Sequence, residues 1–150
     1  MLLDAKLLFS DAQTFTTGSE NGVMSPSSVD LSSARNIGVG TQLYVVIQVA
    51  TTQIATSADV TYIDLVTDDN EGLNSHAVVQ RLGTLAANSV AGTTIVAPLP
   101  PEGSTAYQRY VGLLYTSYDH AQTAGALTAF ITKDPDIYKA YANGYDIATS

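Results

Sequence analysis

The sequence predicts an all-β protein, an antiparallel β-sandwich or a barrel, with a short C-terminal tail. Short apolar or alternating runs recur along the chain, turn residues separate them, and no segment has the periodicity of a convincing amphipathic helix. The composition agrees, because only 13% of the residues are charged. Thr, Val, Ile and Tyr, which favour pleated and half-buried surfaces, take up much of the remainder.

The first half of the chain holds two weak and two strong strand candidates. Residues 12–17 and 29–31 are short and only weakly patterned. Residues 43–49 are apolar on both faces, which predicts a central strand that is covered on each side. Residues 60–67 form the next strand, and the Asp, Asn, Glu and Gly residues of 68–72 predict the turn that ends it.

Four further strands are predicted in the second half. Residues 78–85 and 93–97 come first, and Pro98 ends the latter because proline cannot donate a hydrogen bond to a strand ladder. Residues 107–118 alternate over a long run. Residues 126–132 alternate small or apolar residues with Thr before an Asp-Pro pair ends the strand.

We expect one sandwich domain, residues 1–135, followed by a Tyr-rich C-terminal tail, residues 136–150. No interior linker or fixed-period repeat divides the chain. Residues 1–10 are apolar enough to pack either on a neighbouring molecule or on their own sheet.

The tail supplies the candidate partner-contact residues. They are Tyr138, Tyr141 and Tyr145. Their spacing of three and four places them on one face if the tail is helical. Tyrosine is enriched at interfaces because it has a large rigid ring and a polar tip, so these residues pack either on their own sandwich or on a partner.

Charge and composition exclude several classes of partner and chemistry. The formal net charge of −8 disfavours nucleic acid and anionic membrane surfaces. The chain has no Cys, which excludes disulfides, thiolate metal sites and a Cys nucleophile. No basic, apolar leader begins the sequence and no apolar run is long enough to cross a bilayer, so we expect a soluble product that is initially cytosolic.

Enzyme motifs are also missing, and we expect no catalytic residues, no cofactor and no metal. The glycines at 38 and 40 begin a dinucleotide-like pattern but precede a strand where a helix is required. His76 and His120 are better interpreted as exposed histidines than as members of a triad. The acidic run 68–71 invites a metal hypothesis, but Val79 stands where a calcium loop needs its closing Glu, which favours a solvated turn.

Several of these segments together resemble one family. It is the capsid cement (decoration) proteins of short-tailed bacteriophages, of the type found on the Bordetella phage head. The matching segments follow in order over residues 1–135: Leu7 to Gln13, Ser33 to Gly40 running into Leu43 to Val46, Thr67 to Asn70, Leu99 to Pro101, Arg109 to Val111, and Ala124 to Thr132.

This resemblance implies a jelly-roll sandwich that sits on the outside of an icosahedral shell and clamps neighbouring major capsid subunits. It implies a homodimer on the capsid exterior of the virion, made in the host bacterial cytoplasm. It implies no catalytic residues. The predicted function is therefore structural, with the major capsid protein as the partner.

Two other function classes remain open from the residues. A carbohydrate- or receptor-binding jelly-roll module of a virion adsorption structure would use some of the nine Tyr for sugar stacking, although the absence of Trp weakens this interpretation. A hydrolase on the same fold would need a cleft with two carboxylates facing each other.

Overall fold

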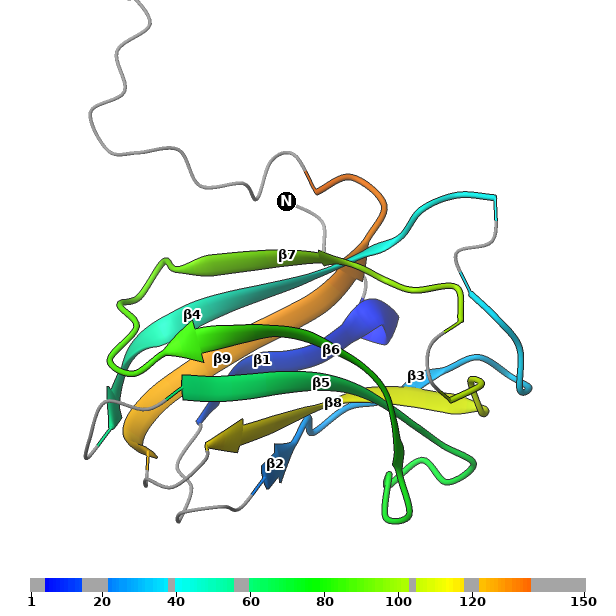
Figure 1. Ribbon diagram of the computed structural model, residues 1–150, viewed down its shortest axis with the longest axis horizontal. Coiled ribbons are helices and arrows are strands. Elements are labelled where there is room, and N and C mark those ends of the chain that lie inside the picture. Colours follow the sequence, from blue (N-terminus) through cyan, green and yellow to red (C-terminus); the bar gives the residue numbers. More distant parts are fainter. Residues whose placement is uncertain are drawn as a thin grey trace, which may run out of the picture.

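The protein folds into two antiparallel β-sheets packed face to face, as the computed structural model shows (Figure 1). The structure describes residues 5–14, 22–37, 40–55, 60–102, 105–117 and 122–135. Over these ranges the elements are η1 (Ala5–Leu7), β1 (Leu8–Thr14), β2 (Gly22–Met24), β3 (Val29–Asp30), β4 (Tyr44–Ala55), β5 (Val60–Asp68), β6 (Ala77–Ala86), β7 (Thr94–Pro98), β8 (Tyr110–Ser117) and β9 (Gln122–Thr132). No helix in these ranges is long and apolar enough to span a membrane.

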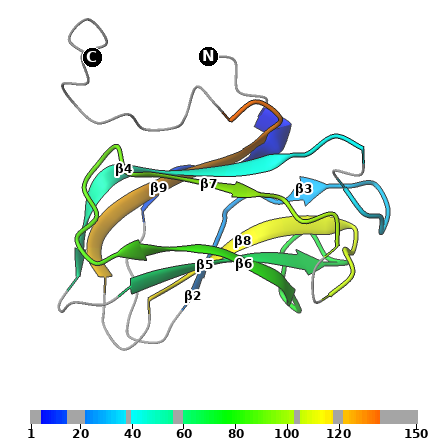
Figure 2. The same cartoon turned by 45° about the horizontal axis from the view of Figure 1, so that its top comes forward.

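Sheet A has the strand order β1-β9-β4-β7, and sheet B has the order β2-β8-β5-β6, with β3 also pairing with β8. The chain crosses repeatedly between the sheets, so strands that are adjacent in space are mostly distant in sequence. Figure 2 shows the two layers from a tilted view. This arrangement is a jelly-roll-like sandwich, which confirms the fold class predicted from the sequence.

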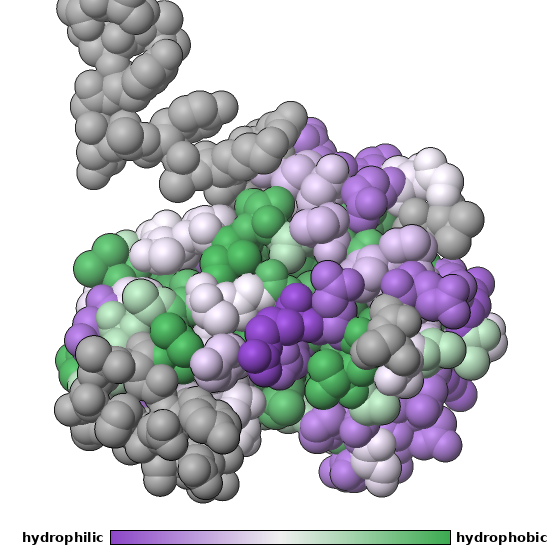
Figure 3. Space-filling view, in the orientation of Figure 1, coloured by the Kyte–Doolittle hydropathy of each residue, from purple (hydrophilic) through white to green (hydrophobic). Residues whose placement is uncertain are grey.

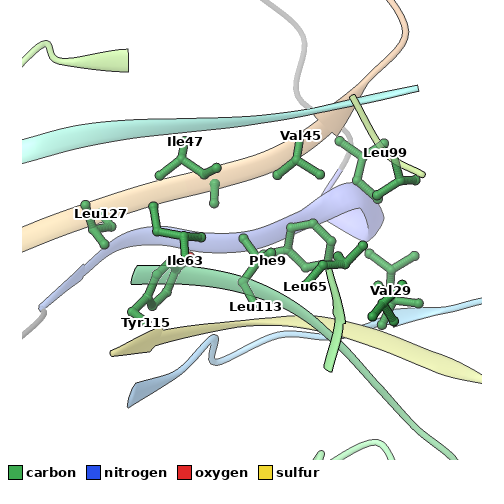
Figure 4. Close-up of a cluster of buried hydrophobic side chains, with 14 of the residues drawn as sticks. Phe9, Val29, Val45, Ile47, Ile63, Leu65, Leu99, Leu113, Tyr115 and Leu127 are labelled. Carbon is green, nitrogen blue, oxygen red and sulfur yellow. The ribbon is translucent and has the colours of Figure 1, made fainter. Parts of the chain in front are cut away.

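The core lies between the sheets and is built from the inward-facing residues of each strand (Figure 4). Sheet A contributes Phe9, Val45, Ile47 and Leu127, and sheet B contributes Ile63, Leu65, Leu113 and Tyr115. All eight are at most 1% exposed, so alternate residues of each central strand stabilise the sandwich by burying apolar surface.

The structure corrects some predicted strand boundaries. The first strand begins at Leu8 rather than at residue 12, and Phe9 is fully buried in the core, so residues 8–10 belong to the chain's own sheet. Two register shifts against β9 and a positive φ of 45° at Ala12 break the alternation that the prediction needed. Strand β2 was not predicted, because three partly exposed residues carry no readable pattern.

A chain of hydrogen bonds joins the sheets near β1. Ser10 Oγ donates to Gln13 Oε1 at 3.0 Å, and Gln13 Nε2 donates to the Met24 carbonyl at 2.9 Å. Because the single hydroxyl proton of Ser10 goes to Gln13, Tyr115 must donate its own proton to Ser10, 2.8 Å away. Burial raises the pKa of the Tyr115 hydroxyl, which keeps it a donor.

Candidate functional site

The three tyrosines predicted to contact a partner, Tyr138, Tyr141 and Tyr145, lie outside the described residues, as do His120 and the whole predicted tail. The described surfaces that remain are the outer faces of the two sheets and the loops that join them. Figure 3 shows one side of the molecule, on which hydrophilic residues gather at the right-hand end and hydrophobic ones show in smaller groups to the left and centre.

In the acidic turn after β5, side-chain oxygens accept hydrogen bonds from backbone N–H groups of the same turn. Asp68 accepts the backbone N–H of Ser75 at 2.7 Å and that of Asn70 at 3.2 Å, and Asn70 accepts the N–H of Gly72 at 2.9 Å. Burial acts to raise the pKa of Asp68, but these donated hydrogen bonds outweigh it and hold the pKa below its ordinary value. In the described ranges no three His, Asp or Glu side chains gather closely enough to hold a metal ion.

The same loop lies on the outer face of sheet B. Leu73 is only 3% exposed and packs over Gly112 of β8. The Nδ1 atom of His76 lies 3.0 Å from the Leu73 carbonyl oxygen, which gives this histidine a local structural partner. The Asp68 carboxylate, the Asn70 amide and His76 therefore hold the shape of this loop.

On one side of this loop lies the Arg81 cluster, made of Tyr62, Asp64, Arg81 and Thr116. The Nε atom of Arg81 donates to Asp64 Oδ1 at 2.8 Å and Nη2 donates to Oδ2 at 3.3 Å. The guanidinium carbon lies 4.1 Å from the centre of the Tyr62 ring. These four residues line a shallow pocket of about 260 Å³.

A β-bulge aligns this cluster. Ile63 pairs with Gly83 but Asp64 pairs with Arg81, so Leu82 is an extra residue in β6. Leu82 packs against the core, and Arg81 is left directly opposite Asp64 on the outer face.

The Arg109 cluster, made of Asp30, Arg109 and Tyr110, lies at the other end of β8. Arg109 donates to both carboxylate oxygens of Asp30 at 2.9 Å, and its guanidinium carbon lies 5.0 Å from the Tyr110 ring centre. The hydrogen bonds from Arg109, followed by the one from the Ser32 N–H, lower the pKa of Asp30 to about 2. Both charged side chains are roughly half exposed.

The two clusters share the outer face of sheet B. Tyr110 and Thr116 alternate with the core residues of β8, so both point outward, and their six-residue separation corresponds to about 20 Å of strand. Gly112, which lies under Leu73, falls between them. Sequence reasoning missed these clusters because the pairing of Asp64 with Arg81, and of Asp30 with Tyr110, is a property of strand register.

The outer face of sheet A carries a different feature, a row of apolar residues that crosses all four strands. In register, Val96 of β7 lies beside Val46 of β4, Val46 beside Phe130 of β9, and Phe130 beside Leu8 of β1. We call these four residues the sheet A row. They alternate with core residues of the same strands and therefore face away from the core.

Two solved structures show limited similarity to this chain. One, the structure of infectious bursal disease virus Gx strain, has a TM-score of 0.39 and 14% identity over 85% of this chain and 31% of that chain. The other holds the CBM22-1 and GH10 modules of the Clostridium thermocellum endo-1,4-beta-D-xylanase 10B complexed with xylohexaose, with a TM-score of 0.38 and 15% identity over 93% of this chain and 29% of that chain. This chain thus spans about a third of each of those longer chains.

A search of curated proteins found none that matches this chain. The family model Bbp16, in contrast, matches residues 9–131, from Phe9 in β1 to Ile131 in β9. The matched range takes in the full sandwich apart from the outermost residues of its first and last strands. The chain belongs to the Bbp16 family, which takes its name from a Bordetella phage protein.

Proposed function

We propose that this protein is a capsid decoration protein: it binds the outside of a phage head, clamps neighbouring major capsid subunits and catalyses no reaction. The observation that carries the proposal is the family match, which spans the body of the sandwich and ties the chain to a phage protein family. A body of two packed antiparallel sheets is suited to bridging two neighbours without deforming.

The outer face of sheet B supplies the contact surface in this proposal. Arginine and tyrosine are the residue types that dominate protein–protein hot spots, and this face presents two arginines beside two tyrosines. In each cluster an aspartate holds the guanidinium in a fixed plane. The arginine side chain is therefore ordered before a partner binds, and binding costs little further side-chain entropy.

The proposed clamping rests on thermodynamic linkage between binding and the arrangement of the shell subunits. A protein that binds only the mature arrangement of shell subunits stabilises that arrangement by mass action. As a homodimer, each unit would touch several subunits and gain avidity from contacts that are individually weak. The net charge of −8 would keep the free protein away from host and packaged nucleic acid.

Cosedimentation with undecorated mature heads tests this proposal. We expect the wild-type protein to bind at micromolar concentration, and the double variant Tyr62→Ala/Arg81→Ala to bind at least about tenfold more weakly. Val90→Ser is the matched control, because Val90 is 63% exposed, belongs to neither cluster and should not alter binding. Absence of wild-type binding would overturn the proposed function, whereas equal binding by the double variant would overturn the assignment of the Arg81 cluster as a contact.

A sugar- or receptor-binding role is the second candidate, and the pocket beside Tyr62 is the observation in its favour. Its volume of about 260 Å³ falls below the roughly 300–1,000 Å³ of typical ligand sites. Arg81 also covers one face of the Tyr62 ring, so a sugar could not stack there without displacing the ion pair. Glycan-array binding that Tyr62→Ala abolishes would favour this candidate over decoration.

A further inference from the structure

The two central residues of the sheet A row are buried although they face away from the core, whereas Leu8 and Val96 at its ends are half-buried. Val46 is fully buried and Phe130 is 1% exposed. Both strands are central in sheet A, with core residues on either side of each outward one: Val45 and Ile47 around Val46, and Ala129 and Ile131 around Phe130. A valine on a sheet face that met water would retain exposed surface, so other residues of this chain cover Val46 and Phe130.

The short helix η1 accounts for only part of this cover. It lies against β9 and leads directly into β1, at the edge of sheet A. A 3₁₀ helix of three residues is about 6 Å long. Its contacts are with β9, and Val46 lies on the next strand, β4, about 4.8 Å further across the sheet.

The chain that leaves β9 starts beside the row. Phe130 is two residues from Thr132, where β9 ends, and Pro135, the last described residue, is buried. The 15 residues that follow carry Ile137 and three tyrosines. The sheet A row spans four strands, about 14 Å, and 15 residues reach roughly 22 Å as a helix or 50 Å when extended. The segment is therefore long enough in either form.

We propose that residues 136–150 dock on the outer face of sheet A of their own molecule and cover Val46 and Phe130 with tyrosine side chains. Tyrosine suits this position because its ring packs on apolar side chains while its hydroxyl reaches water or the polar flanks of the row, which include Gln48, Thr128 and Thr132. The three tyrosines then belong to the folded body of the protein. A partner that uses sheet A must displace the segment first, which leaves the outer face of sheet B as the freely accessible contact surface.

The cysteine-free chain allows a direct test. A nitroxide on the single variant Asn143→Cys should broaden the methyl resonances of Val46 and Val96 in the full-length protein. The methyls of Val78, which lies 42% exposed on β6 of the opposite sheet, should stay sharp and serve as the internal control. Unbroadened Val46 and Val96 resonances would overturn the proposal.

The same label distinguishes this molecule's own segment from that of a second copy. In a mixture of isotope-labelled chain without nitroxide and unlabelled chain with nitroxide, we expect no broadening at Val46. Broadening at Val46 in the mixture, in proportion to the share of nitroxide-bearing chain, would show that a second copy supplies the segment and would overturn the intramolecular proposal. This NMR measurement uses no capsid, so its result does not depend on whether the proposed function is correct.

A full-length variant gives an independent check. Replacing all three tail tyrosines, Tyr138→Ser/Tyr141→Ser/Tyr145→Ser, should uncover the row, lower the melting temperature and increase the binding of an apolar fluorescent dye several-fold. The control Lys139→Ser/Asp146→Ser changes charged tail residues and should leave both quantities unchanged. Identical melting and dye binding in the two variants would contradict the proposal.

Discussion

Leu73 packs over Gly112 so closely that a Cβ atom on Gly112 would come within 2.2 Å of the Leu73 Cδ1 atom. This contact packs the loop after β5 onto the outer face of sheet B. The contact separates the Arg81 cluster from the Arg109 cluster and gives the face its shape. It depends on a glycine in the middle of a buried strand, where a side chain would ordinarily be favoured.

Gly112→Ala is therefore expected to lower the free energy of unfolding by about 1–3 kcal/mol, because the added methyl overpacks a filled site. Gly83→Ala is the matched control, since its Cβ would meet Ile95 at an ordinary 3.4 Å. Urea denaturation of both variants measures the difference. In the Leu73→Ala background the cost of Gly112→Ala should largely vanish, and an undiminished cost would show that the strain arises elsewhere.

The Asp30–Arg109 pair predicts a particular acid response. The pKa of Asp30 is lowered from 3.8 to about 2, so the stability that this pair contributes is complete above the ordinary pKa and is lost as the pH falls through about 2. Arg109→Ala removes the main cause of the shift and should move the pKa of Asp30 up towards 3.8. Carboxyl NMR titration measures it, with Arg81→Ala as the control that should leave Asp30 unchanged.

The Asp64–Arg81 pair should show measurable coupling in a double-mutant cycle. The Asp64 side chain is only 10% exposed, so its attraction to Arg81 is less screened than that of an ordinary surface pair. We expect a coupling free energy of about 1 kcal/mol from thermal or urea unfolding of Asp64→Asn, Arg81→Gln and the double variant. A coupling of zero would mean that the Asp64–Arg81 ion pair lines the pocket beside Tyr62 without contributing to stability.

Two buried tyrosines predict the alkaline limit of stability. Burial raises the pKa of Tyr107 to about 12 and raises that of Tyr115 as well. The unfolded chain therefore loses these protons near the ordinary pKa of about 10 while the folded chain keeps them, so stability falls as the pH rises above that value. Tyr115→Phe should flatten this fall, which is measured by unfolding at a series of alkaline pH values. An unchanged slope would contradict the assignment.

Strand positions were predictable where alternation and turn residues coincide. The predicted run 60–67 became β5, Val60–Asp68, and 78–85 became β6, Ala77–Ala86, because a turn follows one and precedes the other. The predicted run 43–49 matched only the first part of β4, which continues to Ala55. In this extension the register against β9 shifts repeatedly, and a shifted register removes the period on which the prediction rests.

The candidate contact surface was less predictable. The sequence drew attention to three tail tyrosines, whereas the described surface presents Tyr62 and Tyr110, each beside an arginine. Nothing local distinguishes these two tyrosines from the others. Each becomes a candidate contact because an arginine that is fixed by an aspartate lies beside its ring. The sequence does not show this pairing, since Asp30 lies 79 positions from Arg109.

The sequence by itself determined that this protein is a two-faced β structure, because side-chain alternation along a strand is a local property that folding cannot change. It also indicated that residues 43–49 would be covered on both faces, which the full burial of both Val45 and Val46 confirms. Only the tertiary structure decided which strands became neighbours. Register and sheet order follow from how the whole core packs, and they place Asp64 opposite Arg81, Leu73 over Gly112 and Val46 beside Phe130.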